Sequence, residues 1–135
     1  RIVELASKGK YDGIAFHRVI EGFMAQTGDV QFGKVGGDFS MAGRGGSDMP
    51  DLPAEFSNIP FDRGIVGMAR AQNPDSANSQ FFIMFKEGYF LNGQYTVVGK
   101  VVAGMDVIDD IKLGLGSNGS VLGSPDFMEQ VRQKQ

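Results

Sequence analysis

The apolar residues of this chain come in short runs separated by glycine-rich connections, and this spacing restricts the fold more than any other feature. Runs rich in aromatic and β-branched residues cover 65–71, 80–85 and 95–102, and each has the length of a single strand. Glycine accounts for 20 of the 135 residues, roughly twice its usual share. The pattern predicts a mainly β domain, either a barrel or a sandwich.

The remaining strand signals are less regular. Residues 14–24 form a further strand pattern, with a kink or bulge expected at Glu21 and Gly22. Residues 28–63 show no sustained period and form a long connection, which in a compact domain is usually functional. Residues 124–126 resemble the start of a helix.

Two short helices are predicted. The first spans the beginning of the chain and ends before Gly9, although no capping residue precedes it. We therefore expect a single domain over residues 1–135 that is incomplete at its amino end. In the second helix Asp106 is the expected cap and Gly114 the end, with a buried stripe of Val107, Ile108 and Ile111.

Composition excludes several function classes. The chain has no cysteine, which removes disulfides, thiol catalysis and Cys-based zinc sites, and its single histidine leaves little room for a metal centre. The net charge of −3 provides no positive surplus for binding phosphate backbones. No apolar run is long enough to span a membrane. We expect neither metal nor cofactor, and neither nucleic acid nor membrane as a partner.

Three motifs resemble functional signatures, but each has a simpler interpretation. Residues 28–34 nearly complete a phosphate-binding loop, but Val35 stands where Ser or Thr would bind Mg²⁺. The sequon-like triplet 118–120 is also a turn signal. A Ser-His-acid hydrolase would use His17, yet no serine lies in a G-x-S-x-G elbow.

Arg18 is more informative. Strand alternation places it on one face with Phe16 and Ile20, where it either extends to water or points into a pocket as a fixed donor. Alternation likewise puts Gln80 on an apolar face of the strand 80–85. Two polar residues on otherwise apolar strands favour a small-ligand pocket.

Three blocks, FHRVIEGFMAQTGD at 16–29, GMARA at 67–71 and NSQFFI at 78–83, closely resemble the cyclophilin peptidyl-prolyl isomerases in order and spacing. The similarity runs from about residue 1 to about residue 123. It implies a closed eight-stranded antiparallel β-barrel capped by two short helices, with the first two strands missing from this chain. It also implies isomerisation of X–Pro bonds without a cofactor.

The resemblance assigns roles to individual residues. Arg18 would be the catalytic arginine, with His17 and Gln80 beside it. The substrate-binding residues would be Phe23, Met24, Gln26, Ala69, Arg70, Ala71, Phe82, Phe90, Leu91 and Tyr95. Many relatives carry Asn at the position of Arg70, a difference that a backbone contact tolerates.

Phe90 and Tyr95 stand where many eukaryotic members have Trp and His, and both are similar to the bacterial branch, which typically binds cyclosporin weakly. The loop 33–53 also resembles that branch. The expected partners are proline-containing peptides and unfolded clients, and the expected state is a cytoplasmic monomer, with the periplasm as the alternative location. The alternative function is a proline-peptide binding module or chaperone without catalysis.

Overall fold

The computed structural model describes residues 1–134, and most of its regular structure is β. The seven strands are β1 (Ile14–Ala15), β2 (Arg18–Ile20), β3 (Met24–Thr27), β4 (Ile65–Met68), β5 (Phe81–Met84), β6 (Val97–Lys100) and β7 (Phe127–Met128). The helices are α1 (Ile2–Ser7), α2 (Met105–Asp109) and the 3-10 turns η1 (Phe39–Met41) and η2 (Tyr89–Leu91). The mainly β class with two short α-helices is therefore confirmed.

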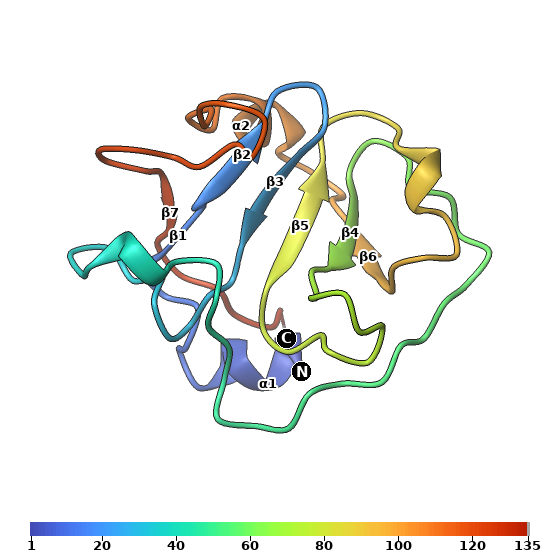
Figure 1. The fold of residues 1–135 in the computed structure, drawn as a ribbon, viewed down its shortest axis with the longest axis horizontal. Coiled ribbons are helices and arrows are strands. Elements are labelled where there is room, and N and C mark those ends of the chain that lie inside the picture. Colours follow the sequence, from blue (N-terminus) through green and yellow to red (C-terminus); the bar gives the residue numbers. More distant parts are fainter. Residues whose placement is uncertain (135) are drawn as a thin grey trace.

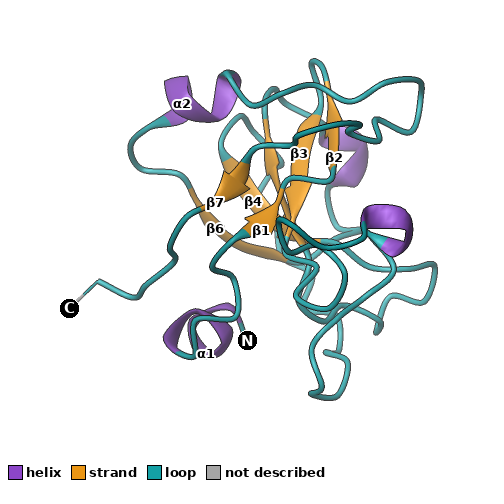
Figure 2. Cartoon of the chain, turned by 90° about the vertical axis from the view of Figure 1, so that its left-hand side faces the viewer, coloured by secondary structure: helices purple, strands orange, loops and turns teal. Residues whose placement is uncertain are grey.

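The strands form two antiparallel sheets. The larger sheet has the order β2-β3-β5-β4-β6, and β1 pairs with β7 in a separate ribbon. Helices α1 and α2 lie near opposite ends of the strands (Figure 1) and stay separated after a quarter turn (Figure 2).

The predicted closed eight-stranded barrel is not confirmed. Closure requires every strand to pair on both sides, whereas β2 and β6 are the two edges of the five-stranded sheet within residues 1–134. Strand β6 is largely exposed from Val98 to Lys100.

The strand expected over 14–24 is interrupted, and this prediction was wrong in its details. The kink expected at Glu21 and Gly22 is a complete reversal of the chain, because the Phe23 amide donates to the Ile20 carbonyl at 3.0 Å. Gly22 adopts the left-handed conformation, with φ of +71°, which glycine tolerates without steric cost. The reversal pairs β2 with β3 directly.

Two further local predictions need correction. Gly104, not Asp106, is the N-cap of α2, which ends at Asp109 instead of continuing toward Gly114. Val107 is 67% exposed and so does not belong to the buried stripe, whereas Ile108 packs against the core and Ile111 is buried.

The segment 124–126 leads into a strand and not into a helix. β7 pairs with β1, with Met128 opposite Ile14 and Phe127 opposite Ala15. This pairing joins the two ends of the chain, which a local helix-start pattern cannot reveal.

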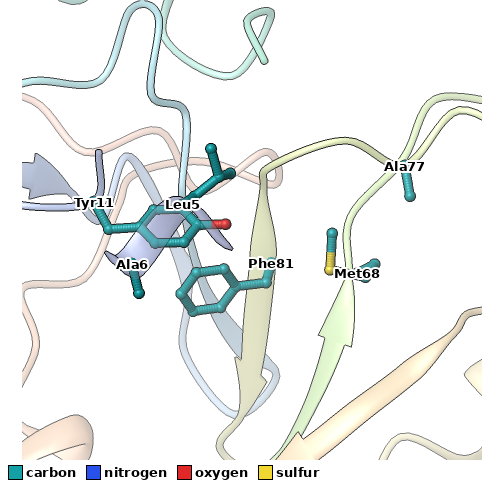
Figure 3. Packing of buried hydrophobic residues seen from close by; sticks show 6 residues of the cluster. All are labelled: Leu5, Ala6, Tyr11, Met68, Ala77 and Phe81. Carbon is teal, nitrogen blue, oxygen red and sulfur yellow. The ribbon is translucent and has the colours of Figure 1, made fainter. Parts of the chain in front are cut away.

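Buried side chains gather in three clusters. One of them lies between α1 and the sheet and contains Leu5, Ala6, Tyr11, Met68, Ala77 and Phe81 (Figure 3). The Tyr11 ring meets that of Phe81 edge to face, with 5.5 Å between ring centroids. The Tyr11 hydroxyl donates to the Ser79 carbonyl at 2.7 Å, so the one polar atom of this buried ring is satisfied.

Candidate active site

An apolar hollow of about 310 Å³ lies on one face of the five-stranded sheet, and we call it the Phe82 pocket. Side chains from β2, β3, β5 and η2, together with the segments after β2, β4 and η2, form its walls. Its lining consists of Arg18, Phe23, Met24, Gln26, Ala69, Arg70, Phe82, Phe90, Leu91 and Tyr95. Ten of the thirteen residues that the sequence assigned to the site therefore meet in one place.

Strand register explains why these side chains share a face. Gln26 lies opposite Arg18 on β2 and opposite Phe82 on β5. Cross-strand partners project to the same side of a sheet, so the guanidinium, the amide and the ring are brought together.

Gly67 makes room for the aromatic floor of the pocket. It lies opposite Phe82 across the ladder, and a Cβ there would lie 2.6 Å from Phe82 Cζ and 2.8 Å from Phe61 Cε1. The two rings stack with centroids 5.8 Å apart. A side chain at position 67 would displace both rings.

A directional relay of hydrogen bonds holds Arg18. Arg18 Nη1 donates to Gln26 Oε1 at 3.0 Å, Gln26 Nε2 donates to Gln80 Oε1 at 2.9 Å, and Gln80 Nε2 donates to the Gly45 carbonyl at 2.9 Å. Arg18 Nε also donates to the Asn118 carbonyl at 2.8 Å. Because each amide donates at one end and accepts at the other, the Gly45 carbonyl orients Gln80, and Gln80 in turn presents the oxygen of Gln26 to the guanidinium.

The far end of this relay is fixed by Asp29, which the sequence reasoning did not assign to the site. Its carboxylate has no exposed surface. One oxygen accepts from the amides of Gln31 and Phe32 at 3.0 and 2.8 Å, and the other accepts from those of Gly43 and Gly45 at 2.8 and 3.0 Å. The only signal in the sequence is an acidic residue at the start of the glycine-rich connection.

Arg70 is held rigidly at the opposite rim. Its guanidinium lies 4.5 Å above the Tyr95 ring and donates to the Gln94 carbonyl at 2.7 Å. Its backbone N–H and C=O make no hydrogen bond within the described residues 1–134, whereas the amides of Ala69 and Ala71 are both paired. The backbone of Arg70 is therefore available to an extended peptide.

Two further hollows adjoin the Phe82 pocket. The Gln80 pocket, of about 260 Å³, contains Gln80 and Ala71, and the His17 cavity, of about 740 Å³, contains His17. These are the three assigned residues that do not line the Phe82 pocket. Gln26 lines all three hollows, so they lie side by side, and together we call them the groove.

His17 lies beside the groove with its ring largely enclosed. Both ring nitrogens are buried and have no hydrogen-bond partner within residues 1–134. Burial lowers the pKa of His17, the nearby Asp29 carboxylate raises it, and Arg18 lowers it further. The ring is thus held neutral, and it lines the His17 cavity and not the Phe82 pocket.

No group of three or more His, Cys, Asp or Glu side chains within residues 1–134 is arranged to bind a metal ion. In the same part of the chain no helix is both long and apolar enough to cross a membrane.

An apolar pocket, a fixed guanidinium and the unpaired backbone of Arg70 thus lie together in a domain of the mainly β class. The family model for cyclophilin type peptidyl-prolyl cis-trans isomerases matches residues 1–132. The chain belongs to this family.

Relatives in sequence support the same assignment. The chain is 63% identical over 128 residues to a probable peptidyl-prolyl cis-trans isomerase of Brucella abortus, covering 93% of this chain and 65% of the relative. It is 42% identical over 107 residues to a peptidyl-prolyl cis-trans isomerase of Acinetobacter baylyi, covering 75% and 52% respectively. The chain thus spans less than two thirds of the length of these relatives.

Solved structures share the fold. A Cryptosporidium parvum cyclophilin type peptidyl-prolyl cis-trans isomerase, crystallised in the presence of the dipeptide Ala-Pro, matches with a TM-score of 0.78 and 26% identity, covering 99% of this chain and 83% of the other. A cyclophilin from Hirschia baltica matches with a TM-score of 0.74 at 23% identity, covering 94% and 61% respectively.

Proposed function

We propose that this chain catalyses cis-trans isomerisation of X–Pro peptide bonds in peptides and unfolded proteins. The observation that carries the proposal is the position of Arg18, a guanidinium held at the edge of an apolar pocket by two hydrogen bonds to neutral oxygens. The dipeptide Ala-Pro, in whose presence the Cryptosporidium structure was determined, is a chemical match for the substrate proposed here.

The reaction requires neither a nucleophile nor a metal. Rotation about the X–Pro bond is opposed by a barrier of roughly 18–20 kcal/mol, because the amide has partial double-bond character. As the bond twists, the prolyl nitrogen becomes pyramidal and gains a lone pair. A donor aimed at that nitrogen stabilises the twisted state more than the planar one, which is the condition for catalysis.

Arg18 is suited to be that donor. Its Nη2 donates to no acceptor within residues 1–134, while Nε and Nη1 are both engaged and fix the plane of the group. A planar guanidinium held at two points loses little freedom when it forms a further hydrogen bond. In this proposal Gln26 and Gln80 orient Arg18, and His17 shapes the adjoining wall.

The pocket would hold the proline ring itself. The side chains of Met24, Phe82 and Leu91 are nearly fully buried around it, and burying a ring of this size contributes about 1.5–3 kcal/mol. The unpaired backbone of Arg70 would pair with the peptide. Together these contacts would hold one side of the X–Pro bond while the other side turns.

The direct test is an NMR exchange or protease-coupled assay on an X–Pro tetrapeptide. The proposal predicts strong acceleration of isomerisation by folded wild-type protein. Binding of the peptide without acceleration would establish the alternative, a proline-peptide binding module or chaperone. A serine-directed reagent should label nothing.

Cyclosporin binding is expected to be weak. Phe90 is 72% exposed at the pocket rim and has no hydrogen-bond donor, whereas Trp, found at this position in many relatives, supplies an indole N–H. Isothermal titration of wild type beside Phe90→Trp checks this, with tighter binding expected for the variant. Equal cyclosporin affinities of the two proteins would show that a hydrogen-bond donor at position 90 does not affect binding.

A further inference from the structure

Three arginines line the groove and form no ion pair within residues 1–134, although the chain as a whole carries a net charge of −3. Arg18 and Arg70 line the Phe82 pocket, and Arg70 and Arg44 line the Gln80 pocket, with no acidic residue in either lining. Only the His17 cavity adds a carboxylate, that of Asp38.

None of the three arginines has an acidic partner in the part of the chain that the structure describes. The guanidinium of Arg18 contacts the neutral oxygens of Gln26 and Asn118, and that of Arg70 contacts backbone carbonyls and the Tyr95 ring. The guanidinium of Arg44 makes no hydrogen bond within residues 1–134.

Asp38 does not neutralise them. Its carboxylate accepts from the Ser40 amide at 2.9 Å and so caps η1. This contact lowers the pKa of Asp38, so the carboxylate is charged at neutral pH, but it forms no ion pair with any groove arginine.

Two of the three arginines outside the groove form ion pairs, whereas Arg1 donates to the carbonyls of Asn78 and Pro50. Arg63 is paired with Asp109 at 2.7 Å and Arg132 with Asp12 at 2.8 Å. No comparable ion pair within residues 1–134 involves Arg18, Arg44 or Arg70.

We propose that the groove selects X–Pro segments that carry an acidic side chain within two residues of the proline, and that Arg44 is the principal specificity residue. This rests on the proposed function and names its substrate class. Arg44 lies at the junction of the Gln80 pocket and the His17 cavity, and it is exposed and unpaired, so it can reach a carboxylate on either branch. Arg18 and Arg70 add to the field but are fixed by their own contacts.

The experiment compares peptides with neutral ends that differ at one residue. Glu, Gln or Lys occupies either the second residue before the proline or one of the two residues after it, and kcat/KM is measured by NMR exchange. At the most favourable position kcat/KM for the Glu peptide should exceed that for the Gln peptide by about 2- to 5-fold, with the Lys peptide below Gln, since partly exposed charge pairs have modest energies.

Two controls isolate the charge of Arg44. Arg44→Gln should reduce the Glu-to-Gln ratio to below about half its wild-type value, whereas Lys8→Gln, which removes the same charge at the exposed end of α1, should leave it unchanged. The ratio should fall toward one as salt is raised from about 0.01 M to about 1 M, because the screening length shrinks from roughly 30 Å to 3 Å.

The outcomes separate this inference from the proposed function. Isomerisation of the Gln peptide with a Glu-to-Gln ratio near one at every position, or a ratio that Arg44→Gln does not change, would overturn the acidic preference and leave the isomerase function standing. No acceleration of any peptide would instead overturn the proposed function.

Discussion

The buried carboxylate of Asp29 gives the sharpest prediction about stability. Replacing it with Asn preserves the shape of the side chain but turns one acceptor oxygen into an NH₂ group. Whichever oxygen is lost, a donor then faces two backbone amides, because each oxygen accepts two N–H groups.

The cost follows from these contacts. A hydrogen bond to a charged group contributes about 1.5–3 kcal/mol, so losing two of them destabilises the fold by about 3–6 kcal/mol. Small domains have only about 5–15 kcal/mol in total. The Asp29→Asn variant should therefore unfold at a much lower urea concentration.

Urea denaturation followed by circular dichroism measures the change, and hydrogen exchange at the amides of Gly43 and Gly45 locates it. Asp48→Asn is the matched control, because Asp48 lies on the same connection, is exposed and makes no side-chain hydrogen bond within residues 1–134. It should change stability by less than about 0.5 kcal/mol. An Asp29→Asn variant that loses less than about 1 kcal/mol, with both amides still protected, would refute the reasoning.

Two further predictions concern variants at His17 and Gly67. Burial lowers the pKa of His17 in the folded state, so the contribution of His17 to stability is complete above the unfolded pKa of about 6.5 and is lost as pH falls through that value toward the folded pKa. Because His17 is the only histidine, the urea midpoint of wild type should decline between about pH 7.5 and 5.5, and that of His17→Gln should decline less. Parallel pH profiles of the two proteins would contradict this. Gly67→Ala should lower the free energy of unfolding by about 1–3 kcal/mol through overpacking, and it should lower kcat/KM by displacing Phe82. A variant with wild-type stability and turnover would show that the rings of Phe61 and Phe82 can move aside freely.

The composition of the Phe82 pocket could be predicted because seven of its ten residues lie in the three blocks that carry the family resemblance, which also assigned Phe90, Leu91 and Tyr95. The strand that carries Gln80 and Phe82 is continuous, and alternation alone fixes which of its side chains share a face. The polar residues on apolar strands, Arg18 and Gln80, then become visible as exceptions, whereas Gln26 was assigned only by the resemblance.

Features that depend on distant backbone groups were missed. The donors that hold Asp29 include the amides of Gly43 and Gly45, which no side-chain pattern marks. The β2–β3 reversal was interpreted as a kink because Glu21-Gly22 is not one of the strong turn pairs and apolar residues continue on both sides. β7 is defined only by its pairing with β1 at the other end of the chain.

Arg18 is the centre of the account, and its removal is the most direct test. Isomerisation of a neutral X–Pro tetrapeptide should be measured by NMR exchange for wild type, Arg18→Ala and Arg18→Lys, with urea midpoints recorded for all three. We predict that Arg18→Ala lowers kcat/KM by at least about 10²-fold, the usual effect of removing one preorganised donor, with little change in the urea midpoint. Arg18→Lys should also be poor, because a single mobile ammonium cannot keep both the Gln26 and Asn118 contacts. Wild-type turnover in a folded Arg18→Ala protein would contradict the mechanism.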